Sequence, residues 1–329
     1  MNLTDHLQSA LIRLLGVSLR RFSLRRVKKI AAWLGRFFYR HLPIRKDVAL
    51  ANLKLCFPEK NEAEIESIIE KTYVNVATVF LEFLYFPKFT KENVGEVLDF
   101  PEESRRLIRS ALDRGKGLIL ISGHFGNWEL GAFAIGAFSS KQFTIIVHPF
   151  HNKAVDKIVN RYRSLLGNLP VPMDNAVRAS LSTLRENGVV ALLADQSSAK
   201  ESLPAKFFGM DVPTFQGPSI FALRTQAVMA TGFSTRKDDG TYRLVLNEIG
   251  YSDLKDDSEA SVAELTQRHV SALEEFIRKY PENWLWFHKR FKHVPAFQEK
   301  LQEVKADKSR MVPKDAKARK DSLSGGRKP

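Results

Sequence analysis

Short runs of apolar residues alternate with amphipathic helical patterns along the middle of the chain, and this alternation most constrains the fold. The clearest run is Gly117–Ser122, and the apolar helical segment 127–138 follows it. Similar runs occur at 143–147 and 189–194, with helical spacing between them. A continuous apolar run is typical of a strand that is buried on both faces of a parallel sheet. We therefore predict an α/β fold with a largely parallel central sheet covered by helices.

The remaining periodic segments extend this pattern over most of the chain. Helical spacing predicts helices over 61–86, 102–114, 153–166, 176–186, 218–226 and 261–279, and apolar runs predict strands near 228–234 and 242–249. Length alone permits two domains, but the 329 residues equally fit one α/β domain of about 250 residues with attached ends. We place that domain at 47–298, between a helical segment at 1–46 and a tail at 299–329.

The net charge of +14 invites a nucleic-acid interpretation, but the charge lies at the two ends. Residues 1–46 contain eleven basic residues and one acid, and residues 299–329 contain ten basic and five acidic residues. The domain between them is nearly neutral, with 30 basic and 31 acidic residues. A basic groove for nucleic acid is therefore not indicated. The tail, with its Ser-Gly-Gly sequence and scattered charges, is predicted to be disordered.

The N-terminal segment has the pattern of a helix that lies on a membrane surface. Leucines recur at three- and four-residue spacing from Leu3 to Leu15, and 27–42 mixes aromatic and basic residues. The longest uncharged stretch in the first helix, Leu14–Leu19, is far shorter than the roughly 20 residues that span a bilayer. We expect an amphipathic segment among anionic headgroups. The alternative is a basic helix packed on the core, because amphipathicity alone does not distinguish the two.

A histidine follows the first buried strand, at the edge of the sheet where ligands bind in α/β folds. The segment 122–129 leaves the strand, turns on two glycines and enters a helix, which places His124 at the strand exit and Glu129 five residues later. A histidine can take a proton from a hydroxyl, and a carboxylate on its other ring nitrogen fixes the tautomer. The alternative is a structural histidine beside a common acid.

Motifs for competing chemistries are absent from the sequence. It contains no Gly-x-Ser-x-Gly elbow, no phosphate-binding loop of the Gly-x-x-x-x-Gly-Lys-Ser/Thr type and no His-Glu-x-x-His. The single cysteine, Cys56, excludes a disulfide framework and a cysteine-rich zinc site, and it is expected to pack as a small apolar residue. His148 and His151 form only a weak metal-binding pattern. We predict no metal and no bound cofactor.

Two further clusters follow strands or helices near the same edge. Asp195 and Gln196 come directly after the apolar run 189–194, so a second carboxylate is expected beside His124, although a helix cap or loop acid is an equal alternative for Asp195. Arg161 and Arg163 lie on a predicted helix, where they could hold a phosphate or a developing oxyanion or simply be solvated. The segment 281–292, with two tryptophans and four potential cations, is expected to form an interfacial belt or a phosphate-facing edge.

Together these blocks resemble one known family, the lysophospholipid acyltransferase-like enzymes of lipid A biosynthesis, the late lauroyl/myristoyl acyltransferases. The resemblance extends to about Pro295 and is carried by Arg45, Asn52-Leu53, Phe57-Pro58-Glu59, His124-x-x-x-x-Glu129, Arg161 and Arg163, Asp195-Gln196, Phe207-Phe208-Gly209 and the Trp-x-Trp-x-His-Lys-Arg-Phe run. Glycerolipid relatives usually have Asp where this chain has Glu129. Each block is weak alone, but their order and spacing are specific.

The resemblance implies a glycerolipid acyltransferase-like fold and a catalytic pair, His124 and Glu129. It implies acyl carrier protein, or acyl-CoA, as donor, an anionic glycolipid as acceptor, and a place on the cytoplasmic side of the cell inner membrane. We further expect Asn127, Asp195 and Gln196 to bind substrate. The alternatives are the same chemistry on a lysophospholipid, a mannosylated inositol lipid or an ornithine lipid, or a non-catalytic lipid-binding protein.

Overall fold

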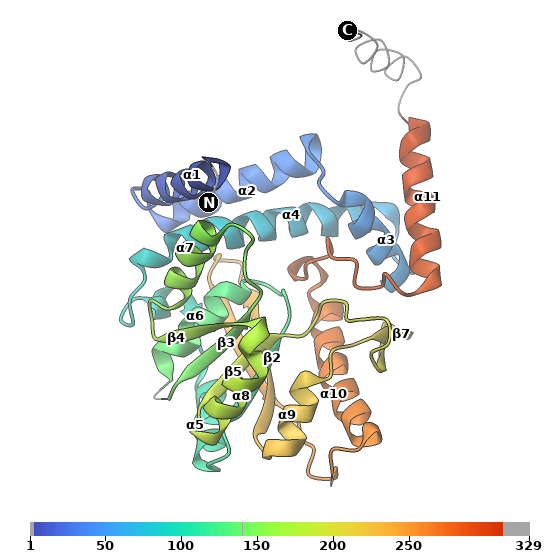
Figure 1. Cartoon of the computed structure of the whole chain (residues 1–329). Coiled ribbons are helices and arrows are strands. Elements are labelled where there is room, and N and C mark those ends of the chain that lie inside the picture. The colour runs from blue at the N-terminus through green and yellow to red at the C-terminus, as the bar shows by residue number, and fades with distance from the viewer. Residues whose placement is uncertain (1–2, 140, 255, 312–329) are drawn as a thin grey trace.

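The computed structural model describes residues 3–139, 141–254 and 256–311 (Figure 1). Its α-helices are α1 (Leu3–Leu19), α2 (Leu24–His41), α3 (Lys46–Cys56), α4 (Glu62–Tyr85), α5 (Glu102–Asp113), α6 (Trp128–Phe138), α7 (Lys153–Arg163), α8 (Ala176–Arg185), α9 (Gly217–Thr225), α10 (Glu259–Lys279) and α11 (Pro295–Met311). Its strands are β1 (Leu98–Asp99), β2 (Leu118–Ser122), β3 (Phe143–Val147), β4 (Asn168–Pro172), β5 (Val189–Leu193), β6 (Pro204–Phe207), β7 (Met210–Pro213), β8 (Val228–Arg236) and β9 (Tyr242–Glu248).

Seven strands of this part of the chain form one sheet in the order β1-β9-β8-β2-β5-β3-β4. All neighbouring pairs are parallel except β8 and β9, which are antiparallel, so the prediction of a largely parallel sheet is confirmed. Strand β2 lies near the middle, between β8 and β5, and its register pairs Ser122 with Leu193 of β5. The segments that leave β2 and β5 therefore start side by side at the carboxyl edge of the sheet.

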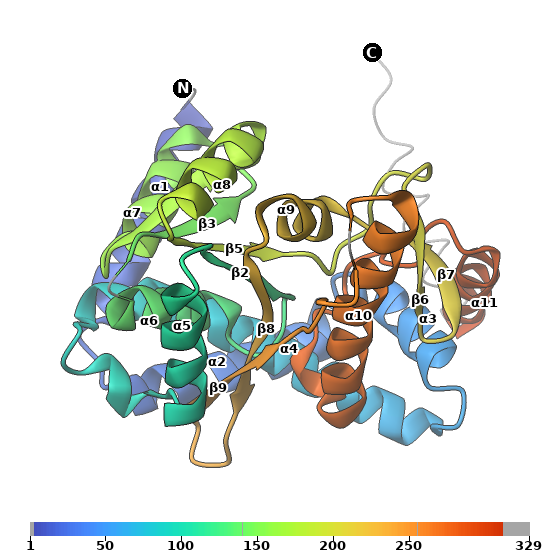
Figure 2. The ribbon, with the colours of Figure 1, turned by 90° about the horizontal axis from the view of Figure 1, so that it is seen from below.

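Helices cover both faces of the sheet, as the sequence predicts. Leu118 and Leu120 of β2 pack in a core with residues of α4, α5, α6 and α7, whereas Ile119 and Ile121 face a core formed with α8, α9 and α10. This alternation follows from the two-residue period of a strand. Figure 2 shows α5 and α6 on one side of β2 and β8, with α9 and α10 on the other. The strands are apolar on both sides because both sides are buried.

The predicted N-terminal helices form, and they pack through small residues. Helix α2 buries Val27, Ala31 and Gly35 against α4, and a Cβ on Gly35 would lie 2.5 Å from the Cα of Val74. Only glycine allows so close an approach. Helix α1 points most of its leucines outward: Leu3 and Leu11, for example, are 75% and 65% exposed, whereas Leu19 is buried. Among the described residues, no helix combines the length and apolar character needed to cross a membrane.

Several elements were not predicted, and one prediction was wrong. The strand β4, the helix α3 and the hairpin β6–β7 lie in stretches without a clear apolar period. The tail was expected to be disordered from residue 299, but residues 299–311 continue the helix α11. Phe297 and Leu301 of α11 are buried in a core shared with α3. These two apolar residues hold the helix on the domain, although most of its other residues are polar or charged. Residues 312–329 lie outside the described residues.

The burial of Phe297 predicts that α11 contributes to the stability of the domain. We expect Phe297→Ala to lower the free energy of unfolding by about 3 to 5 kcal/mol, because it removes a fully buried ring. Gln302→Ala, on the exposed surface of the same helix, should change it by less than about 0.5 kcal/mol. Urea denaturation of both variants measures the difference. Equal stabilities would show that α11 is not part of the folded core.

Candidate active site

The loop between β2 and α6 is built around a glycine that no other residue can replace without rearrangement. Gly126 has φ +57°, and a Cβ there would lie 1.5 Å from the carbonyl oxygen of Ser234 on β8. Its N–H donates to the carbonyl of Asn283, and the N–H of Leu285 donates to the carbonyl of His124. The loop is thus held between β8 and the segment after α10, which fixes where His124 lies.

The imidazole of His124 is held by Asp195, which follows β5. Its Nδ1 lies 2.9 Å from Asp195 Oδ1, and its backbone N–H donates to Asp195 Oδ2 over 2.8 Å. The indole N–H of Trp284 donates to the same Oδ2 over 2.9 Å. A carboxylate on Nδ1 places the ring proton there and leaves Nε2 with a free lone pair.

Burial and charge set the protonation of this pair. The Asp195 side chain is only 3% exposed; its burial disfavours the charged form, but the charge of His124 and the donors around the carboxylate prevail and lower the pKa of Asp195 to about 2. Burial likewise disfavours a charged imidazole, yet the Asp195 charge and hydrogen bond raise the pKa of His124 above its ordinary value. Asp195 is therefore ionised at neutral pH, and the imidazole is a stronger base than a free histidine.

Glu129 does not contact the ring of His124 as its place in the sequence suggested. It lies in the first turn of α6 and binds Arg163 of α7 through two hydrogen bonds, of 2.9 Å to Nε and 2.5 Å to Nη2. Both side chains are 16% exposed. The expectation that Glu129 orients His124 is corrected, since Asp195 occupies Nδ1. Glu129 is instead one half of a bidentate ion pair near His124, in which the charge of Glu129 raises the pKa of the imidazole and that of Arg163 opposes this.

The other predicted site residues divide into buried and exposed groups. Asn127 is fully buried; its side chain caps α6 by accepting from the N–H of Leu130 and donates to Glu82 of α4. Asp195 is also buried, and its carboxylate contacts His124 and Trp284. Gln196 is exposed, with Nε2 at 3.5 Å from His124 Nε2, and borders the open side of the imidazole.

The paired arginines of α7 separate in the structure. Arg163 binds Glu129 beside the site, whereas Arg161, two residues earlier, is exposed on the surface of α7. Residues two apart on a helix point in different directions, so the two cannot serve one group together. Arg163 is therefore the arginine at the candidate site, and sequence spacing alone did not separate them.

The tryptophan-rich segment after α10 is core rather than surface, which corrects both expectations for it. Trp284, Trp286 and Phe291 are at most 1% exposed, and Arg290 is 2% exposed. Arg290 donates to the carbonyl of Pro213 and to the hydroxyl of Thr214. Two tryptophans among cations resemble a membrane belt in composition, but here the indole of Trp284 binds Asp195. This contact was not predicted from the sequence.

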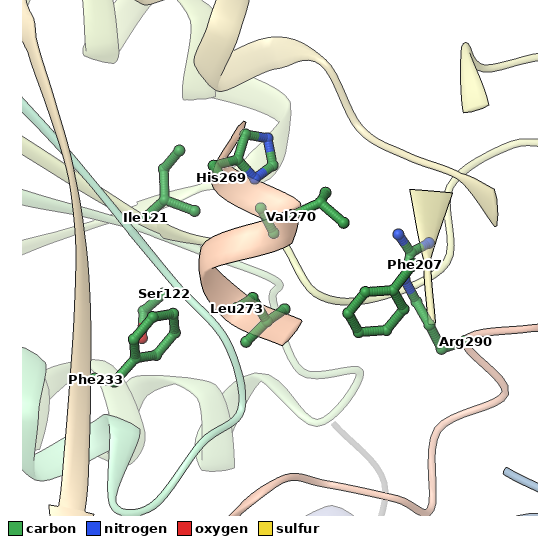
Figure 3. Close-up of a pocket in the computed structure, with 9 residues that line it drawn as sticks. Ile121, Ser122, Phe207, Phe233, His269, Val270, Leu273 and Arg290 are labelled. Atoms are coloured by element: carbon green, nitrogen blue, oxygen red, sulfur yellow. The ribbon is translucent and has the colours of Figure 1, made fainter. Parts of the chain in front are cut away.

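A small cavity lies next to the carboxyl ends of β2 and β5, where Ser122 and Ala194 line it (Figure 3). His269 and Arg290 line it together with Ser122 and apolar side chains, and Nε2 of His269 and Nε of Arg290 have no hydrogen-bond partner among the described residues. Burial and the nearby Arg290 lower the pKa of His269 to about 3, so that ring is neutral. The cavity is comparable in size to a water molecule, which suits a buried water bridging these groups.

The site therefore contains an imidazole, His124, that Asp195 orients, and a guanidinium, Arg163, that Glu129 holds in place. In the described part of the chain, His, Cys, Asp and Glu side chains do not gather in a group of three or more that could hold a metal ion. His124 presents Nε2 for proton transfer, and Arg163 supplies a fixed positive charge. Such a pair suits deprotonation of a hydroxyl that attacks an activated carbonyl.

Residues 3–293 match the family described as bacterial lipid A biosynthesis acyltransferase, and the chain belongs to this family. It is an acyltransferase, as the resemblance implied.

Individual relatives include acyltransferases of two kinds. The chain is 26% identical over 262 residues to the lipid A biosynthesis palmitoleoyltransferase of Escherichia coli, which covers 78% of this chain and 82% of that protein. It is 24% identical over 275 residues to the lipid A biosynthesis lauroyltransferase of the same organism, with 82% and 86% covered. It is also 24% identical over 224 residues to a phosphatidylinositol mannoside acyltransferase of Mycolicibacterium smegmatis, with 67% and 70% covered.

The contact between Asp195 and His124 predicts the direction of a measurable pKa change. In Asp195→Asn, burial of the imidazole remains while the carboxylate charge is lost, so the pKa of His124 should fall below that of the wild type. Asp211→Asn, which changes an exposed aspartate in the β6–β7 hairpin, is the matched control. NMR titration of the histidine ring signals measures both. An unchanged or higher pKa in Asp195→Asn would contradict the arrangement.

Proposed function

We propose that the protein transfers an acyl chain from a thioester donor directly to a hydroxyl of a lipid A precursor, with His124 as the general base. The observation that carries this proposal is the His124–Asp195 pair at the carboxyl edge of the sheet, which makes Nε2, 3.5 Å from the amide nitrogen of the exposed Gln196, the accepting nitrogen of the ring. In the proposed step, Nε2 takes the proton of the acceptor hydroxyl as its oxygen attacks the thioester carbonyl. The resulting imidazolium is stabilised by Asp195, and it returns the proton to the departing thiolate.

Asp195 acts through His124 rather than on the substrate. It accepts from Nδ1–H, so the lone pair of the neutral imidazole is directed at the acceptor. Its second oxygen is already filled by the His124 N–H and the Trp284 indole, which fixes the carboxylate in place. This differs from the His124–Glu129 relay that the resemblance implied, and it assigns the orienting role to Asp195.

Glu129 and Arg163 are proposed to stabilise negative charge as a unit. Two hydrogen bonds fix the guanidinium of Arg163 to the carboxylate of Glu129. The other N–H groups of the guanidinium are not used by this pair. An anchored guanidinium can face the tetrahedral oxyanion or a phosphate of the acceptor without losing side-chain entropy at the moment of reaction. Glu129 thereby contributes by positioning Arg163. Arg161, exposed on α7, fits contact with an anionic headgroup at the surface.

The proposed donor rests on the reactivity of thioesters, and the proposed acceptor rests on the family and its named relatives. A thioester is already activated, so the step needs a base and charge stabilisation but no nucleophilic side chain. Acyl carrier protein is the proposed donor, with acyl-CoA as the alternative. A phosphorylated disaccharide lipid is the proposed acceptor, because the family and most named relatives act in lipid A biosynthesis. A mannosylated inositol lipid is the second candidate, favoured by the mycobacterial relative.

The protein is proposed to associate with the cytoplasmic side of the inner membrane through its N-terminal segment. Helix α1 leaves Leu3, Leu7, Leu11 and Leu14 between 62% and 75% exposed, and α2 leaves Trp33 63% exposed. The exposure of these side chains favours a membrane surface over the alternative in which the helix buries its apolar face in the core. The excess of basic residues in 1–46 suits anionic lipids.

The first prediction from this proposal concerns the base. Purified protein given acyl carrier protein or CoA thioesters and a tetra-acylated lipid A precursor should add one acyl group, read by mass spectrometry. His124→Ala should abolish transfer, and Asp195→Asn should slow it by about 10² to 10⁴-fold, because the imidazole loses its orientation and part of its basicity. The rate should fall as pH drops through the raised pKa of His124, since the imidazolium cannot accept a proton. Asp211→Asn should match the wild type.

The outcomes of this assay separate the candidates. Transfer only to a mannosylated inositol lipid or a lysophospholipid would replace the acceptor and keep the mechanism. Full activity in His124→Ala would contradict the mechanism, and the absence of transfer with every donor and acceptor would favour a lipid-binding protein.

A second prediction concerns the membrane. The Leu7→Asp/Leu11→Asp variant should bind vesicles that contain anionic phospholipid at least tenfold more weakly than the wild type, because two exposed leucines would no longer enter the lipid. Val177→Asp, at an exposed apolar position on α8, serves as the control and should bind normally. Vesicle co-sedimentation at low and high salt measures both. Undiminished binding of the double variant would rule out docking through α1.

A further inference from the structure

A buried carboxylate on α4 takes no part in the proposed chemistry but touches the loop that carries it. Glu82 is 2% exposed, and its Oε2 accepts hydrogen bonds from Asn127 Nδ2 at 2.7 Å and from the Tyr242 hydroxyl at 2.8 Å. The ammonium of Lys28 lies 3.4 Å from its Oε1. A buried carboxylate costs folding free energy unless it is paired and hydrogen-bonded, and an apolar residue of similar size would avoid that cost.

Glu82 fixes which way the amide of Asn127 faces. Oε2 of Glu82 accepts a hydrogen bond from Asn127, so the NH₂ group of Asn127 faces Glu82. The amide oxygen is then free to accept from the N–H of Leu130 at 2.9 Å, which caps the first turn of α6. The two bonds of one amide group thus join α4 to the beginning of α6.

This junction lies between the two parts of the candidate site. Asn127 is three residues after His124 and two residues before Glu129, whose carboxylate holds Arg163. The same helix α4 holds the loop at a second point, where Asn75 donates to the carbonyl of Gly126 over 3.1 Å. Helix α4 therefore sets the path of the backbone between the proposed base and the proposed cation clamp.

Lys28 places its positive charge beside the second oxygen of Glu82. It extends from α2, is 15% exposed, and also donates to the carbonyl of Gly240. Burial raises the pKa of Glu82, and Lys28 is the strongest of the opposing influences, followed by Tyr242, Arg236 and Asn127.

We propose that Glu82 is a positioning residue for the segment His124–Glu129, and that Lys28 of the N-terminal segment completes it as its counter-ion. The effect on catalysis rests on the function proposed above. Because Glu82 is buried and contacts no exposed group of the site, its loss should disturb the geometry of the transition state rather than the binding of substrate.

The chain offers a matched control on the same helix. Glu66 of α4 also pairs with a lysine and a tyrosine: Lys46 Nζ lies 2.8 Å from Oε2, and the Tyr39 hydroxyl donates to that oxygen over 2.7 Å. Its side chain is 35% exposed, and neither partner belongs to the segment 124–129. Substitutions at Glu66 and Lys46 therefore remove similar interactions without touching the loop.

The experiment compares Glu82→Met, Glu82→Gln and Lys28→Met with Glu66→Met, Glu66→Gln and Lys46→Met, all in the full chain. The readouts are kcat and KM for transfer and the hydrogen-exchange protection of the Leu130 amide. We expect Glu82→Met to lower kcat at least 30-fold with KM within twofold of the wild type, and to lower Leu130 protection at least tenfold. Glu82→Gln and Lys28→Met should lower kcat three- to tenfold, because the glutamine oxygen still accepts from Asn127 and Lys28→Met leaves Glu82 in place. The control variants should stay within twofold.

The exchange measurement needs no substrate, so it separates this inference from the proposed function. If the wild type transfers no acyl group, the proposed function fails, while loss of Leu130 protection in the Glu82 variants would still support the positioning role. If Glu82→Met does not fold, the milder Glu82→Gln and Lys28→Met decide the matter by the same readouts. Leu130 protection and kcat equal to those of the Glu66 variants, or a change in KM alone, would overturn the inference.

Discussion

The arrangement of the site depends on one buried carboxylate. Asp195 is 3% exposed and ionised, so the fold must supply donors to both of its oxygens. They come from two places that are distant in sequence: the N–H and imidazole of His124 after β2, and the indole of Trp284 after α10. The carboxylate therefore joins two segments to the end of β5. The same contacts that satisfy its charge also set the position and tautomer of the imidazole.

The sheet register explains why Asp195, and not Glu129, reaches the imidazole. Ser122 pairs with Leu193 in the parallel β2–β5 ladder, so His124 and Asp195 each lie two residues beyond a paired position. The sequence allowed both to be placed at one edge, because each follows a buried strand. It did not show that β2 and β5 are neighbours. Glu129, by contrast, is close in sequence but enters α6 and points toward α7, where Arg163 binds it.

Strand and helix periods predicted most of the fold because both faces of the sheet are buried and each helix covers a core. Composition was less informative where a segment could face either core or surface. The cations around Trp284 and Trp286 predict surface groups, yet both tryptophans are buried, and the charged composition of α11 gives no sign that its Phe297 is buried. Glu82 was not singled out because nothing in a helical period distinguishes a buried acid from an exposed one. Glu82 stands out only through its contacts with Asn127, 45 positions later in the chain, and with Lys28, 54 positions earlier.

The N-terminal segment links the surface of the protein to this interior. Helix α2 contacts α4 through Val27, Ala31 and Gly35, and these small residues bring the two backbones close together. On the same helix, Trp33 is exposed, whereas Lys28 reaches the buried Glu82. One helix thus places Trp33 on the surface proposed to face the membrane and Lys28 beside Glu82, which is proposed to support the loop of His124. Because both depend on the same packing against α4, a change that shifts α2 should disturb membrane docking and loop geometry together.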